Sequence, residues 1–69
     1  MNPVIACVLK ETLWRQYPNV GGGMTFISFL VGVDGAGQRW LWRKHRVVFD
    51  NGLENVGEFE FERLGENRV

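Results

Sequence analysis

The sequence has 69 residues and contains one cysteine, one histidine, one serine and two prolines, with no net charge. One cysteine forms no intramolecular disulfide, and one cysteine with one histidine does not supply the four ligands of a structural zinc site. The longest apolar run, residues 24–33, is about half the length that a membrane helix needs, and no secretory leader is recognisable. We therefore expect one small cytoplasmic domain, residues 1–69, without metal or other cofactor.

Helical periodicity is also scarce, and glycine-rich turns divide the chain into short extended segments. Residues 24–33 (MTFISFLVGV) are apolar at both alternating sets of positions, which predicts a central strand. Residues 4–9 (VIACVL) predict a buried strand, and residues 10–17 either extend it or form one helical turn before Pro18. Turns are expected at residues 19–23, 34–38 and 50–52, where Gly, Asn and Asp gather.

Two further strands are predicted in the second half of the chain. In residues 39–49 (RWLWRKHRVVF), Trp40, Trp42 and Lys44 share one side, and a bulge or bend is expected at residues 43–46. In residues 58–63 (EFEFER), the two phenylalanines are expected on a buried face and the three glutamates on a solvated face. The sequence predicts an all-β protein: a small antiparallel meander or barrel of four to five strands, SH3-like or OB-like in architecture, with little helix.

Charge is distributed unevenly along the chain. Residues 1–49 carry six basic and two acidic side chains, whereas residues 50–69 carry two basic and six acidic ones. Cross-strand pairing between the arginines of residues 39–49 and the glutamates of residues 58–64 is the favoured explanation. The alternative is an acidic face that attracts a basic partner or a second copy.

Catalytic signals are few, and we expect no enzyme. Ser28 lies inside an apolar strand and not in a G-x-S-x-G turn. Cys7 also lies in an apolar run and is expected to be a buried small hydrophobic residue. The glycine clusters match neither the P-loop nor the dinucleotide-binding pattern, so turn formation accounts for them.

One segment indicates nucleic-acid binding as an alternative function. Residues 39–46 (RWLWRKHR) interleave two tryptophans with cationic side chains, and bases stack on exposed aromatic rings while cations neutralise phosphates. The balanced net charge argues against this interpretation, and two tryptophans in so small a domain are expected to fill its core. The residues of this alternative interface are Arg39, Trp40, Trp42, Arg43, Lys44 and Arg46.

The favoured function is non-catalytic protein binding, as a small inhibitor or accessory protein of the phage or mobile-element type that caps a partner surface. The chain has more apolar side chains than one face of a small sheet hides, and no amphipathic helix is available to cover a second face. A homodimer through a sheet face or an edge strand is therefore also expected. Trp, Tyr and Arg are enriched at interface hot spots. The predicted contact residues are Trp14, Arg15, Tyr17, Trp40, Trp42, Arg43, Glu58, Glu60 and Glu62.

Overall fold

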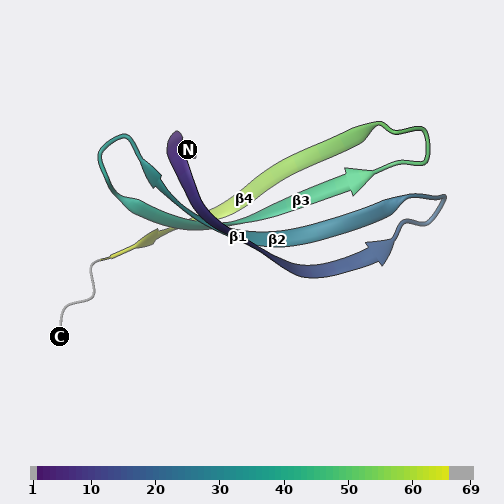
Figure 1. The fold of residues 1–69 in the computed structure, drawn as a ribbon, viewed down its shortest axis with the longest axis horizontal. Helices are drawn as coiled ribbons and strands as arrows, with labels where there is room; N and C mark the ends of the chain where they lie inside the picture. Colours follow the sequence, from purple (N-terminus) through teal and green to yellow (C-terminus); the bar gives the residue numbers. More distant parts are fainter. Residues whose placement is uncertain (1, 66–69) are drawn as a thin grey trace.

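The computed structural model describes residues 2–65, which form one antiparallel sheet (Figure 1). Its strands are β1 (Ile5–Pro18), β2 (Met24–Asp34), β3 (Arg39–Val48) and β4 (Glu54–Leu64), and each pairs with the next along the chain. The predicted all-β meander is confirmed with four strands, and residues 2–65 contain no helix. The sheet is open, because β1 and β4 both remain edges, so the barrel alternative does not form.

Three tight turns connect the strands where the sequence predicts them. The Asp34 N–H donates to the Gln38 carbonyl at 3.0 Å, and the Phe49 N–H donates to the Leu53 carbonyl at 2.9 Å. Gly37 and Gly52 have φ values of 83° and 88°, which residues with a Cβ rarely adopt. The predicted turn residues are therefore explained by backbone geometry.

Strand β1 is longer than its partner and is exposed along almost its whole length. It has 14 residues against the 11 of β2, and three register shifts, at Ala6, Leu9 and Trp14, take up the difference. Bulges of this kind bend an edge strand and protect it from pairing with other chains. The prediction that residues 4–9 are buried is wrong, and so is the prediction for Cys7, which is exposed. An edge strand with no covering layer offers these apolar residues no buried environment.

The strand register assigns the side chains to two faces. The groove face carries Phe26, Ser28 and Leu30 of β2, whose partners on β3 are Arg46, Lys44 and Trp42. The aromatic face carries the alternate residues of β2, which are Thr25, Ile27, Phe29, Val31 and Val33, with Val47, His45, Arg43, Leu41 and Arg39 on β3.

Trp42 is the centre of a small core on the groove face. It is 2% exposed, stacks on Phe61 with 5.1 Å between ring centroids, and pairs with Leu30, which is 4% exposed. Gly32 makes room for it, since a Cβ at Gly32 would lie 2.8 Å from Trp42 Cη2. The expected core role of the tryptophans is confirmed for Trp42, whereas Trp40 is half-buried.

A bulge in β4 changes the faces on which its side chains lie. Two residues of β4, Glu60 and Phe61, lie opposite Trp42 alone, and Glu60 has a φ of 59°. Phe61 therefore stacks on Trp42 on the groove face, while Phe59 contacts His45 on the aromatic face. The prediction that both phenylalanines share one face is wrong, because the bulge reverses the alternation. The bulge expected as one alternative at residues 43–46 does not form, because β3 pairs with β2 without a register shift there.

The molecule is elongated because its strands form a single layer. It measures 48 × 23 × 19 Å, and its Cα radius of gyration is 14.3 Å. A compact domain of 69 residues has a radius of about 11 Å. Among residues 2–65, only three large apolar side chains are buried, namely Ile27, Leu30 and Trp42. Both faces of the sheet therefore remain largely open to solvent (Figure 1).

Candidate functional site

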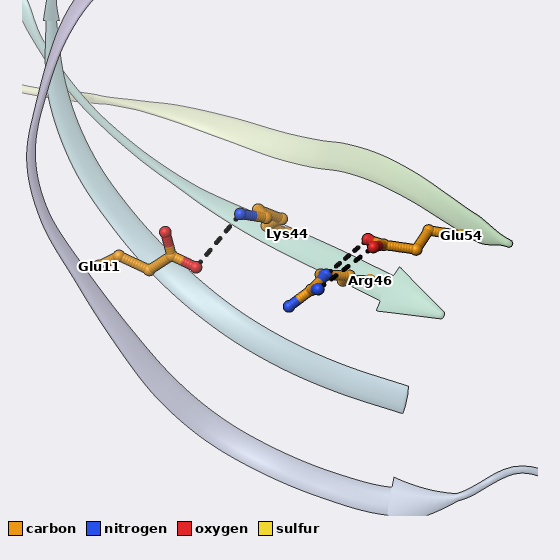
Figure 2. A network of polar contacts seen from close by, with 4 residues as sticks. All are labelled: Glu11, Lys44, Arg46 and Glu54. Atoms are coloured by element: carbon orange, nitrogen blue, oxygen red, sulfur yellow. Dashed lines mark hydrogen bonds and ion pairs between the residues drawn. The ribbon is translucent and has the colours of Figure 1, made fainter. Parts of the chain in front are cut away.

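A groove on the groove face is bordered by charged side chains, whose ion pairs Figure 2 shows. The Lys44 ammonium group reaches from β3 across β2 to the Glu11 carboxylate of β1 at 3.3 Å. Between these two strands, Ser28 of β2 lies in register with Lys44 and is 6% exposed. The groove has a volume of about 250 Å³. Its lining combines apolar and charged side chains from three strands, which are Glu11, Leu13, Phe26, Ser28, Lys44 and Arg46.

An ion pair near the groove and hydrogen bonds in a turn shift the pKa values of three side chains. Arg46 donates to Glu54 at 2.7 Å, and this hydrogen bond lowers the pKa of Glu54 and raises that of Arg46. At the opposite end of the sheet, the Trp40 indole donates to Asp34 at 3.0 Å. That bond, with the backbone N–H groups of Gln38 and Ala36, lowers the pKa of Asp34. These shifts come from structural ion pairs and turn hydrogen bonds in which the charged forms are already satisfied.

The basic segment proposed for nucleic-acid binding is divided between the two faces. Trp40, Trp42, Lys44 and Arg46 lie on the groove face, whereas Arg39 and Arg43 lie on the aromatic face. Trp42 is buried and offers no ring to a base. The cations are largely paired within the chain: Arg43 with Glu60 at 3.0 Å, Lys44 with Glu11 and Arg46 with Glu54. The expected pairing of residues 39–49 with the glutamates of residues 58–64 is confirmed for Arg43 and Glu60, whereas the partners of Lys44 and Arg46 lie outside that segment.

The aromatic face exposes a strip of large rings. Trp14 is 50% exposed and lies 5.4 Å from Phe29, which is 36% exposed. Tyr17 is 46% exposed and Phe59 is 45% exposed. Phe59 faces Arg43 across the ladder and packs edge-on against His45 at 5.4 Å. Together the four rings expose on the order of 350 Å² of mainly apolar surface, comparable to the largest patches on ordinary monomers.

The two edges of the aromatic face carry opposite charges. On β1, Lys10 and Arg15 lie in register with Val31 and Ile27, which places both cations on this face. On β4, Glu62 lies in register with Leu41 of this face, and Glu60 bonds to Arg43. The strip of rings is therefore bordered by a cationic edge and an acidic edge.

The structure brings some of the predicted contact residues together and separates others. Trp14, Arg15 and Tyr17 lie side by side on the aromatic face, and the Arg15 guanidinium lies 4.4 Å from the Trp14 ring centroid. The three glutamates do not form one stripe, because Glu58 lies opposite Lys44 on the groove face while Glu62 lies on the aromatic face.

Sequence reasoning missed three members of this surface, Lys10, Phe29 and Phe59. Phe29 belongs to a strand that is apolar on both faces, so no alternation distinguishes its exposed residues from its buried ones. Phe59 lies before a bulge that the sequence does not reveal. Lys10 is assigned to a face only by the register of the bulged strand β1.

The described residues hold no cluster of three or more His, Cys, Asp or Glu side chains arranged to bind a metal ion. None of their segments is a helix of the length and apolarity needed to cross a membrane. No protein-family model matches the sequence, and neither the curated proteins nor the solved structures contain a significant match.

Proposed function

We propose that the chain is a non-catalytic protein-binding module, and that the aromatic face is its docking surface. The observation that carries this proposal is the exposure of Trp14, Tyr17, Phe29 and Phe59 on one face of a single-layer sheet. Aromatic residues at the centre of such a patch are the side chains that dominate binding energy in protein interfaces. A protein surface that covers the strip forms the second layer that domains of this kind normally contain.

Charged residues at the two edges of the strip of rings determine which partner surfaces fit it. Arg15 and Lys10 on one edge and Glu62 on the other present charges of both signs, so a partner surface needs the complementary arrangement. A small inhibitor or accessory protein that caps a partner would use such a face, because a rigid sheet loses little conformational freedom on binding.

The proposal is tested with variants that change the surface without changing the core. A tagged chain and its Trp14→Ser/Tyr17→Ser variant serve as baits in a lysate of the source cells, and retained proteins are quantified by mass spectrometry. Leu53→Ser is the matched control, because Leu53 is a 66% exposed apolar residue in the β3–β4 turn. Circular dichroism verifies that each bait is folded.

We expect at least one protein to be retained by the wild-type chain and by Leu53→Ser, and to be depleted at least tenfold by the double variant. Truncation of one interface hot-spot residue costs about 2 kcal/mol or more, so loss of two contacts is sufficient for this depletion. Identical sets of retained proteins for all three baits would contradict the proposed function.

A further inference from the structure

We infer that the surface that covers the aromatic face is a second copy of this chain, related by a two-fold axis parallel to the strands. This inference rests on the proposed role of the aromatic face as a protein-docking surface. It adds the identity of the partner and the orientation in which it docks. Three observations support it: the excess of accessible surface, the charge on the two edges, and the pairing of rows across the sheet.

The accessible surface is larger than a chain of this mass normally retains. The chain exposes 5265 Å² and has a mass of 7.9 kDa. A folded monomer of that mass exposes about 4,400 Å². The excess of about 850 Å² is close to the roughly 800 Å² that each partner buries in a standard protein interface. One further layer of the same width as the sheet therefore restores the normal surface of a folded chain.

The charges on the aromatic face are self-complementary in one orientation. Rotation about an axis parallel to the strands lays β1 of one copy over β4 of the other. The cationic edge formed by Lys10 and Arg15 then faces the acidic edge formed by Glu60 and Glu62, and this happens twice in the dimer. Rotation about an axis in the sheet plane but perpendicular to the strands would lay β1 over β1 and β4 over β4, with like charges opposed.

The strand register identifies which cation and anion face each other between the two copies. Lys10 is aligned with Val31, Val31 with Leu41, and Leu41 with Glu62, so one row of the sheet begins with a cation and ends with an anion. Within one copy these two side chains stand three strands apart, about 14 Å, and do not pair. In the two-fold dimer, Lys10 of each copy lies over Glu62 of the other.

The aromatic residues complement one another in the same orientation. In the neighbouring row, Thr12, Phe29, Arg43 and Phe59 follow one another across the four strands. Rotation lays Phe29 over Arg43 of the second copy, where an arginine and an aromatic face attract each other. It also lays Phe59 close to the Trp14 and Phe29 rings of the second copy. The result is a sandwich of two four-stranded sheets with the charged grooves on its outer surfaces.

A charge exchange tests this arrangement in the full chain. Sedimentation equilibrium measures the dissociation constant of the wild type, Lys10→Glu, Glu62→Lys and the double variant Lys10→Glu/Glu62→Lys. Each single reversal replaces two attractive pairs with two repulsive ones, so we expect the dimer to weaken about tenfold in each single variant. The double variant restores the opposite charges and is expected to return to within about threefold of the wild-type constant. Glu58→Lys is the matched control, because Glu58 is on the same strand but on the groove face, and we expect no change.

Cross-linking of the wild-type chain provides a second readout that does not depend on variants. Isotopically light and heavy copies are mixed and treated with a carbodiimide, which joins a lysine directly to a carboxylate. We expect a mixed light–heavy product that links Lys10 to Glu62.

A wild-type chain that stays monomeric at all concentrations would overturn the inference. A Lys10→Glu/Glu62→Lys variant whose dimer is no tighter than the dimers of the single variants would also overturn it. A second outcome separates this inference from the proposed function. If the wild-type chain is monomeric but retains a different protein from the lysate, and the Trp14→Ser/Tyr17→Ser bait does not retain that protein, this inference is overturned and the proposed function stands. If the Trp14→Ser/Tyr17→Ser variant still forms the dimer and its bait retains the same proteins as the wild-type bait, both the inference and the proposed function are overturned.

Discussion

Replacement of Gly32 by alanine tests how tightly the buried side chain of Trp42 is enclosed. A Cβ at position 32 would lie 2.8 Å from Trp42 Cη2, 2.8 Å from the Cys7 carbonyl oxygen and 3.0 Å from Ile5 Cγ2. Trp42 has little room to move, because it is 2% exposed and stacked on Phe61. Overpacking of this kind costs about 1–3 kcal/mol, and the lower entropy of the unfolded alanine chain returns about 0.4–1 kcal/mol. We expect Gly32→Ala to lower the free energy of unfolding by about 1–2 kcal/mol.

Urea unfolding followed by circular dichroism measures this loss, at one fixed protein concentration so that any association is held constant. Gly35→Ala is the matched control, because a Cβ at Gly35 has no atom within 4 Å, and we expect it to be neutral or slightly stabilising. In a Trp42→Phe background the Cη2 atom of the indole is absent but the Cys7 carbonyl oxygen remains, so the loss at position 32 is expected to shrink without disappearing. Equal effects at the two glycines, or an undiminished loss in the Trp42→Phe background, would refute the reasoning.

Two further predictions concern the bulge in β4 and the turn before β3. Glu60 has a φ of 59°, a conformation that glycine adopts more easily than alanine. We therefore expect Glu60→Gly to be more stable than Glu60→Ala by about 1 kcal/mol in urea unfolding, although alanine is usually more stable than glycine inside a strand. A Glu60→Ala variant that is more stable than Glu60→Gly would contradict the assigned bulge. The hydrogen bond from Trp40 lowers the pKa of Asp34 in the folded chain. The Asp34 carboxylate therefore stabilises the fold at pH values above the ordinary carboxyl pKa, and this stabilisation is lost as the pH falls through the lowered pKa of the folded chain. We expect the stability difference between the wild type and Asp34→Asn to narrow below about pH 4, and a difference that stays constant with pH would contradict this.

Local sequence signals predicted the strands and turns correctly because those signals act over a few residues. The alternation of β3 placed Trp40, Trp42 and Lys44 on one side, as the register shows. The Asp34-Gly35 and Asn51-Gly52 dipeptides marked two hairpin turns, and the left-handed backbone angles of those turns fall on Gly37 and Gly52. The apolar segment of residues 24–33 became an inner strand because it has no polar face to turn toward water.

The candidate surface was only partly predictable, for a physical reason that Phe59 and Cys7 illustrate. Trp14, Arg15 and Tyr17 were predicted as contact residues from their chemistry, and the structure places them together on the aromatic face. Phe59 joined them only because the bulge at Glu60 reverses the alternation of β4. Cys7 was expected inside because its neighbours are apolar, but it lies on a sheet edge that nothing covers.

The sequence by itself determined an all-β chain with short strands, tight turns and more apolar side chains than one sheet face hides. These properties follow from residue type and from spacing over two to four positions. Only the tertiary structure decided that the sheet stays open, that Trp42 is buried while Trp14 is exposed, and that the acidic residues of β4 divide between two faces. Those outcomes depend on bulges and on strand order, through which one inserted residue moves a side chain from one face of the sheet to the other.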